Sequence, residues 1–404
     1  MRSKKKDINI LVLNCGSSSL KYKILRMPEG EELVQGEAER VGIKTQGASL
    51  ITHSTLGSKR IVEADLPDHS AALKKALELI REDSRKNEAI KFDLFAHRYV
   101  HPGRFFNRTT KVSRAVIAKL RNTLPLAPIH NPITYGLVEF CHNAYPGIEQ
   151  FIVFDTAFHK TIPKEFHTYA IPAKIARRFG IRKVGFHGIS HRYVMEEACR
   201  FLKRDKTTQK IISCHLGTGG SSICAIDGGR SINNSMGFTP LEGLMMNTRC
   251  GDIDPGVMFY IMFKEGLAPI EAEKILNTKS GILGVFSASS DLRDAIKDMD
   301  SDPRAKMAFD MYVRRTRAYI SFYGLILKKA DVIIFTDSLG VGLPVLRKNI
   351  CKNMGFLGID ISNVKNESYI KGISDISSPR SNARVLIVPT DEEIMIAREA
   401  YKEL

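Results

Sequence analysis

Two segments about 200 residues apart share one pattern, and this repeat constrains the fold more than any other feature. Residues 10–25 (ILVLNCGSSSLKYKIL) and 211–226 (IISCHLGTGGSSICAI) each lead from an apolar stretch through a polar residue, a glycine and small hydroxyl residues into a second apolar stretch. The pattern predicts a β-hairpin whose turn can hold phosphate oxygens with backbone N–H groups and hydroxyls. One copy alone is typical of an ordinary serine-rich turn. Two copies indicate a duplicated domain with two phosphate-binding turns facing one cleft.

The length of the chain agrees with such a duplication. A chain of 404 residues is too long for one ordinary core, so two domains are expected. Strand-like runs alternate with amphipathic helical stretches such as 71–85 and 304–329, which is typical of α/β layers. We therefore expect a first domain over residues 1–154 and a second over 155–390.

The segment at the start of the chain predicts a strand rather than a targeting signal. Basic residues precede a short apolar run in MRSKKKDINILVLN, but residues 8–13 are too few for a signal peptide. No stretch reaches the roughly 20 apolar residues that span a bilayer, so no membrane contact is expected. The seven cysteines contain no C-x-x-C pair and are odd in number, which favours a reducing compartment and a cytoplasmic location.

The formal net charge of +16 leaves the partner open. Lysine and arginine are spread along the chain among acidic residues, and no nucleic-acid-binding motif is present, so we expect no nucleic-acid partner. A basic surface also attracts anionic, phosphorylated substrates. The sequence contains neither a P-loop nor the motifs of protein kinases, and a serine hydrolase is not indicated.

Seven motifs occur in an order that resembles the acetate kinase family from residue 8 to the C-terminus. They are NCGSSSLK (14–21), HRYVH (97–101), LAPIHNP (126–132), FDTAFH (154–159), GFHGISHRY (185–193), SMGFTPLEGLMMNTRCGDIDPG (235–256) and SGILGV…SSDLRD (280–294). The resemblance implies two duplicated RNase H-like domains around a central cleft, the α/β fold of actin, chaperone ATPase domains and sugar kinases. It also implies that a helix over 391–404 packs back on the first domain and that the second domain binds the donor.

The resemblance implies reversible phosphoryl transfer between acetate and a donor, giving acetyl phosphate. Acetate is ionised at pH 7, so it needs a cation and in-line positioning rather than a general base. Arg98 matches the arginine that holds the carboxylate, a task that suits a bidentate guanidinium. His187 and Arg249 match transition-state stabilisers that present N–H donors. Asp155 matches the family's acid or base and is expected to orient Arg98 or the magnesium shell, while His130 matches a supporting histidine.

A magnesium ion would be held by Asn14 and Glu392, which match the metal site of the family. Glu393 and Thr390 form a T-x-x-E pattern, so we interpret Glu393 as part of a capping box. The acetate pocket of the family is matched by four apolar positions. These are Val100, Ile129, Phe186 and Pro240. A one-methylene preference is worth only about 1–3 kcal/mol, so a propionate or butyrate kinase stays an alternative.

The donor site contains the two turns and three further segments. Its candidate residues are Ser17, Ser19, Lys21, His215, Gly217, Thr218, Gly219, Asp291, Arg293, Ser338 and Gly340. Residues 332–344, VIIFTDSLGVGLP, predict a buried strand that leads into a glycine-bearing loop. We interpret His191 and Arg192, near this site in sequence, as structural.

Several donor-site residues depart from the family pattern. Thr218 replaces an asparagine, Asn247 replaces a glycine, and Asp337 and Ser338 replace the alanine and glycine of FTAGIGEN. A carboxylate and a hydroxymethyl group beside an adenine ring cost space and desolvation. These variants resemble the amoebal branch of the family, which uses pyrophosphate rather than a nucleotide. We favour pyrophosphate/phosphate as the donor pair, and ATP/ADP stays open.

Two further expectations concern assembly and a competing class of protein. The resemblance implies a homodimer formed through the second domain. An actin-like ATPase shares the fold, but it needs none of Arg98, His130, His187 and Arg249, so their joint presence argues against it.

Overall fold

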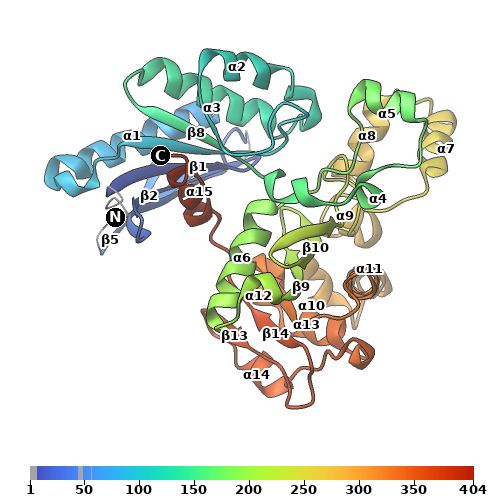
Figure 1. Cartoon of the computed structure of the whole chain (residues 1–404). Helices are drawn as coiled ribbons and strands as arrows, with labels where there is room; N and C mark the ends of the chain where they lie inside the picture. The colour runs from blue at the N-terminus through green and yellow to red at the C-terminus, as the bar shows by residue number, and fades with distance from the viewer. Residues whose placement is uncertain (1–6, 44–48, 56) are drawn as a thin grey trace. The chain divides into compact units, whose positions relative to one another are not determined.

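The computed structural model describes residues 7–43, 49–55 and 57–404 (Figure 1). The basic residues 2–6, which precede the first apolar run, lie outside this part of the chain. Within it, no helix is both long enough and apolar enough to cross a bilayer. The apolar run itself forms strand β1, as the sequence predicts.

The chain divides into two compact units. The first comprises the described residues up to Ala157 together with Asp391–Leu404, and the second comprises Phe158–Thr390. The boundary expected after residue 154 falls slightly short of the observed one. Asp155 belongs to the first unit, because its backbone N–H donates to the carbonyl oxygen of Tyr99 at 2.9 Å.

A mixed sheet in the order β5-β4-β3-β2-β1-β6-β8-β7 forms the first unit. Strands β1 to β5 pair with one another in antiparallel fashion, whereas β6 and β8 run parallel to β1. The first repeat forms the expected hairpin, with Cys15 opposite Leu20 at the turn. The strands are β1 (Ile8–Cys15), β2 (Ser19–Met27), β3 (Glu31–Glu39), β4 (Ser49–Thr55), β5 (Ser58–Ala64), β6 (Leu94–Tyr99), β7 (Thr110–Lys111) and β8 (Glu149–Phe154).

Side chains that alternate along β1 face two different sets of helices. Leu11 and Leu13 share a buried core with residues of α1 and α3. Asn14 lies on the other face of β1 and contacts α15, which also packs on β2, β6 and β8. The helical elements of this unit are α1 (His69–Lys86), η1 (Glu88–Ile90), α2 (Arg114–Arg121), η2 (Leu124–Leu126), α3 (Asn131–Ala144) and α15 (Glu392–Tyr401), with η3 (Ala157–Thr161) at the junction.

A second mixed sheet, in the order β11-β10-β9-β12-β14-β13, forms the second unit. Strand β10 is antiparallel to β9 and β11, whereas β12 and β14 run parallel to β9. The order β11-β10-β9-β12-β14 thus repeats β3-β2-β1-β6-β8 with the same directions, and the predicted duplicated α/β fold is confirmed. The strands are β9 (Lys210–Leu216), β10 (Ser221–Asp227), β11 (Arg230–Asn234), β12 (Val332–Thr336), β13 (Ser374–Asp375) and β14 (Arg384–Ile387).

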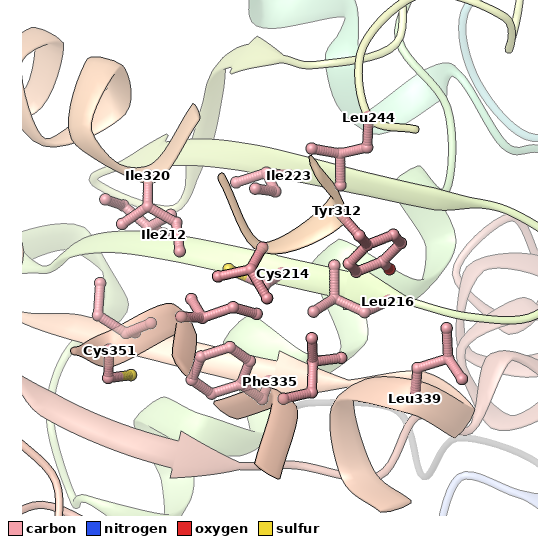
Figure 2. Packing of buried hydrophobic residues seen from close by; sticks show 14 of the residues in the cluster. Ile212, Cys214, Leu216, Ile223, Leu244, Tyr312, Ile320, Phe335, Leu339 and Cys351 are labelled. Carbon is pink, nitrogen blue, oxygen red and sulfur yellow. The ribbon is translucent and has the colours of Figure 1, made fainter. Parts of the chain in front are cut away.

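One core of the second unit lies between its sheet and the long helix α11 (Figure 2), and a second lies on the other face of the sheet against α6. Cys214 and Phe335 of the sheet face Tyr312 and Ile320 of the helix. The helix predicted from residue 304 onward is confirmed as α11. Helices α6 and α11 both contact β9, whereas α4, α5, α7 and α8 form a separate group in Figure 1. The helical elements are α4 (Lys164–His167), α5 (Ala173–Phe179), α6 (Gly188–Phe201), η4 (Lys206–Thr208), α7 (Pro255–Glu265), α8 (Pro269–Thr278), α9 (Gly281–Phe286), α10 (Leu292–Asp298), α11 (Pro303–Leu327), α12 (Asp337–Gly342), α13 (Pro344–Cys351), η5 (Gly355–Leu357) and α14 (Asn363–Glu367).

The segment expected to be a glycine-bearing loop after β12 is instead the short helix α12. Asp337 starts it with a φ angle of +62°, and its carboxylate accepts the backbone N–H of Ser338 at 2.7 Å. At the other end, the guanidinium of Arg347 donates to the carbonyl oxygens of Gly340 and Val341. Both ends of the helix therefore have hydrogen-bond partners. The glycines in this segment predict a loop because they give no sign of these partners.

Candidate active site

Arg98 is the centre of a polar cluster in the first unit. Its Nη2 donates to Asp155 at 3.2 Å, and its Nη1 lies 3.1 Å from Asn14 Oδ1 and 3.2 Å from Glu392 Oε2. Burial alone would lower the pKa of Arg98, but the carboxylates of Asp155 and Glu392 outweigh it and raise the pKa. The Nε–H of Arg98 is buried and has no hydrogen-bond acceptor among the described residues. The guanidinium is thus a fixed cation that keeps N–H donors for an anion.

Neighbouring strands bring these residues together. Arg98 lies on β6, which is parallel to β1 with Leu13 opposite His97, so Asn14 lies beside Arg98. Asp155 directly follows β8, the strand on the other side of β6. Glu392 comes from the first turn of α15. The sheet register and helix α15 together therefore assemble four of the candidate residues named from the sequence.

Glu393 does not have the capping role expected of it. Asp391 caps α15 instead, accepting the backbone N–H of Ile394 at 3.0 Å. Glu393 is buried and accepts a 2.7 Å hydrogen bond from the amide of Asn14, which also donates to Glu392 at 3.1 Å. Burial and the neighbouring Glu392 raise the pKa of Glu393. The capping prediction was wrong because a local pattern cannot show which face of the helix meets β1.

Lys23 is a further residue of this cluster that sequence reasoning missed. This nearly buried lysine of β2 lies 2.8 Å from Asp391 and 3.0 Å from Glu32. It thereby holds the start of α15, and with it Glu392, against the sheet. A lysine between apolar residues in a strand (KYKIL) was the available signal.

The residues fit a magnesium ion in chemistry and proximity. Asn14 and Glu392 supply hard oxygen donors, are in contact with each other, and belong to a cluster with an excess of carboxylates. Across residues 7–43, 49–55 and 57–404, no three His, Cys, Asp or Glu side chains form a metal-binding group. A bound magnesium ion would therefore take its other ligands from water and substrate phosphates.

The other nominated residues of the first unit lie around the β1–β2 turn and before α3. The turn is closed by a hydrogen bond from the N–H of Gly16 to the carbonyl oxygen of Ser19, and Ser17 is exposed. Lys21 is half exposed, 3.8 Å from Glu37. Three further nominated residues belong to this unit: His130 directly precedes α3, Val100 is buried and Ile129 is 43% exposed.

In the second unit, His187 and Arg249 both approach the turn of the second repeat. A Cβ atom placed on Gly220 of that turn would lie 3.3 Å from Arg249 Nη1 and 3.5 Å from His187 Nε2. His187 has a φ angle of +56° at the start of α6, and its ring centroid lies 4.1 Å from that of His215. Burial lowers the pKa of Arg249, and Arg249 Nη1 donates to the carbonyl oxygen of Pro240.

Asp337 and Ser338 contact the same turn from α12. The carboxylate of Asp337 lies 3.1 Å from His215 Nε2. A Cβ atom placed on Gly217 would lie only 1.8 Å from the same carboxylate. The hydroxyl of Ser338 accepts the backbone N–H of Thr218 at 3.1 Å. Asp337 and Ser338 therefore contact His215 and Thr218, two residues that we assigned to the donor site from the sequence.

Three donor-site candidates have other contacts. Asp291 caps α10 and forms an ion pair with Arg293, so these two residues contact each other. Gly340 is buried inside α12 with its carbonyl oxygen bonded to Arg347. A Cβ atom on Gly219 would meet no described atom within 4 Å. Phe186 is buried directly before His187.

Comparisons with known proteins identify the family of the chain. Residues 9–398 match the model of the acetokinase family, so the chain belongs to the acetokinase family. It is 42% identical to an acetate kinase of Porphyromonas gingivalis over 399 residues, 97% of this chain and 98% of that protein. Among solved structures, an acetate kinase from Entamoeba histolytica has a TM-score of 0.85 at 36% identity, with 98% and 99% of the two chains covered. A propionate kinase from Francisella tularensis has a TM-score of 0.88 at 34% identity, with 97% and 98% covered.

Proposed function

We propose that this chain is an acetate kinase that transfers a phosphoryl group reversibly between acetate and a phosphate-containing donor. The observation that carries the proposal is Arg98, a nearly buried cation held by Asp155, Asn14 and Glu392 with its Nε–H without an acceptor among the described residues. A fixed guanidinium suits a small carboxylate. The names of the relatives support acetate, and the propionate kinase keeps a longer acid as the second candidate.

The reaction needs no general base. A carboxylate oxygen of acetate attacks the terminal phosphorus of the donor, and the new P–O bond forms as the bond to the leaving phosphate oxygen breaks. The leaving group, ADP or orthophosphate, departs with the electron pair. Arg98 holds the carboxylate, and Asp155 orients Arg98. In this assignment Asp155 is a positioning residue.

His187 and Arg249 stabilise the charge on the transferred group. Both side chains approach Gly220, so their N–H groups reach the turn where phosphoryl oxygens would bind. Asn14 and Glu392 would hold Mg²⁺. When bound, the ion supplies positive charge to the phosphate oxygens.

For the donor, the contacts of α12 favour pyrophosphate over ATP. The Asp337 carboxylate and the Ser338 hydroxyl lie on the second turn, where they add negative charge and volume close to His215 and Thr218. A short donor can use the rest of the turn and Arg249 without an adenosine pocket. The test is ³¹P NMR of the reverse reaction, in which acetyl phosphate is offered orthophosphate or ADP. Pyrophosphate as product supports this donor, ATP as product overturns the donor assignment, and hydrolysis alone overturns the kinase.

We also propose that the protein is a homodimer formed through the group of helices α4, α5, α7 and α8. Helix α7 is strongly apolar, yet none of its residues is buried within the chain. Phe259, Tyr260 and Phe263 are 62%, 64% and 83% exposed, and Ile270 of the contacting helix α8 is 70% exposed. Such a continuous apolar surface is typical of a permanent interface, and a second copy is the partner that the family suggests.

Light scattering of purified protein tests the homodimer. Wild type is expected at twice the 45.2 kDa chain mass and Phe263→Glu at the chain mass. Ile370→Glu, at an 89% exposed position outside these helices, is the matched control and should stay dimeric. A wild-type monomer would contradict the proposal.

A cytoplasmic location is supported by the cysteines, all seven of which are free thiols.

A further inference from the structure

A series of hydrogen-bonded, buried side chains in the second unit ends at His187. Ser213 Oγ of β9 lies 2.9 Å from His191 Nδ1, and His191 Nε2 lies 2.9 Å from Ser222 Oγ of β10. The same Ser222 oxygen lies 2.9 Å from His187 Nδ1. Ser213, His191 and Ser222 are fully buried. His187 is thus bonded directly to Ser222 and is connected through it to His191, which we interpreted as structural from the sequence, and to Ser213.

The number of protons in this hydrogen-bonded series fixes which residue donates at each step. Burial first, and then His159 and His215, lower the pKa of His191 well below its usual value, so this ring is neutral and carries one N–H. If Ser222 accepted from both rings, its own hydroxyl proton would have no other acceptor among the described residues, so it donates to one ring and accepts from the other. Two directions are possible, and they differ in what happens at Ser213.

Only one direction satisfies every hydroxyl. If Ser213 donates to His191 Nδ1, then His191 Nε2–H donates to Ser222, and Ser222 donates to His187 Nδ1. In the opposite direction His191 would donate to Ser213, whose own proton would find no other hydrogen-bond acceptor among the described residues. Leaving a buried donor unsatisfied costs about 1–3 kcal/mol, so the first direction is preferred.

We propose that Ser222 and His191 are positioning residues that hold His187 with its proton on Nε2. A Cβ atom on Gly220 would lie 3.5 Å from this nitrogen and 3.3 Å from Arg249 Nη1, so the hydrogen-bonded series aims a neutral N–H donor at the turn. The opposite tautomer would present a lone pair to phosphate oxygens and repel them. The role of this N–H in phosphoryl transfer rests on the proposed function, whereas the tautomer itself does not.

The tautomer is measured directly by NMR of the full chain labelled with ¹⁵N-histidine. The His187 signals are assigned by their loss in His187→Asn. The expected pattern is an unprotonated Nδ1 and a protonated Nε2 in wild type, and a mixture of tautomers in Ser222→Ala. A protonated Nδ1 in wild type, or an unchanged pattern in Ser222→Ala, would overturn the proposal. This readout does not depend on catalysis, so its failure is distinct from failure of the kinase assay.

Kinetics separate a positioning role from a merely structural one. We expect Ser222→Ala to lower kcat about tenfold with little change in KM for acetate, less than the roughly 10²–10³-fold cost of losing a transition-state donor. His191→Gln keeps a donor toward Ser222 and should retain most of the activity, whereas His191→Phe should match Ser222→Ala. Ser231→Ala is the matched control, because this buried serine lies 2.8 Å from His159 Nδ1 and is not part of the hydrogen-bonded series that ends at His187. Equal losses in Ser231→Ala and Ser222→Ala would overturn the positioning role.

Discussion

The carboxylate of Asp337 lies 3.1 Å from Nε2 of His215, across the parallel pair of strands β12 and β9. The contact requires glycine at position 217, since a Cβ atom there would lie 1.8 Å from the same carboxylate oxygen. The start of α12 and the second turn are therefore fitted to each other, and α12 takes up a histidine and a backbone N–H that the family resemblance assigns to the donor site.

We predict that Asp337→Ala lowers the apparent KM for ATP about tenfold, equivalent to ~1.4 kcal/mol, because a negative charge leaves the turn. Asp337→Asn keeps the volume and removes the charge, so it separates the two effects. Initial rates against ATP and pyrophosphate measure both. Unchanged constants for ATP in both variants would show that Asp337 does not select the donor.

Arg98→Ala should raise KM for acetate and lower kcat together, with kcat/KM falling by at least about 10²-fold, because acetate loses its cation. Arg98→Lys keeps the charge but not the bidentate geometry, so it should recover only part of the activity. Thermal unfolding of Arg98→Lys controls for loss of the fold. Near-normal kinetics in Arg98→Ala would remove this residue from the site.

A stability prediction concerns Arg347, which is fully buried and has no carboxylate within ion-pairing distance among the described residues. It donates to the carbonyl oxygens of Gly340 and Val341 and to Asn366. Burial lowers its pKa to about 10, so it remains charged at pH 7. Arg347→Ala leaves these acceptors unsatisfied and should lower the free energy of unfolding by about 3 kcal/mol.

Urea unfolding followed by circular dichroism measures this loss. Arg380→Ala is the matched control, because Arg380 is 88% exposed and should change the free energy of unfolding by less than about 0.5 kcal/mol. Equal midpoints for Arg347→Ala and wild type would mean that this guanidinium does not stabilise α12.

His97 predicts how stability depends on pH. Burial lowers the pKa of His97 to about 4, with a 2.9 Å hydrogen bond to Gln150 opposing the shift. Between pH 6.5 and 4 the unfolded chain binds a proton at His97 that the folded chain does not. The contribution of neutral His97 to the free energy of unfolding is therefore complete above pH 6.5 and is lost as the pH falls through this window. His97→Gln should reduce the slope of unfolding free energy against pH by up to about 1.4 kcal/mol per unit in this window. Urea unfolding from pH 4.5 to 7 measures the slope, and an unchanged slope would contradict the assignment.

Local sequence patterns predict local structure in this chain well. The two hairpins and helices α1 and α11 follow from alternation and helical periodicity, because each pattern is complete within its own segment. Helix α12 was missed because six residues with two glycines resemble a loop, and its partner Arg347 lies beyond it in sequence.

The site depends on contacts between segments that are distant in sequence. Arg98 and Asp155 were nominated, but their meeting with Asn14 depends on the pairing of β1, β6 and β8. Lys23 was missed and Glu393 was assigned the wrong role for the same reason, since nothing near them in sequence shows that α15 packs on β1 and β2. Asp337 was interpreted as an obstacle to adenine, and the structure adds its contact with His215.

The most direct test of the proposed function is hydroxylamine trapping of acetyl phosphate in the forward reaction. Wild type and Arg98→Ala would be given acetate and Mg²⁺ with either pyrophosphate or ATP at equal concentration. We expect acetyl hydroxamate from wild type, more with pyrophosphate than with ATP, and its loss in Arg98→Ala. No hydroxamate from wild type with either donor would contradict the assignment as an acetate kinase.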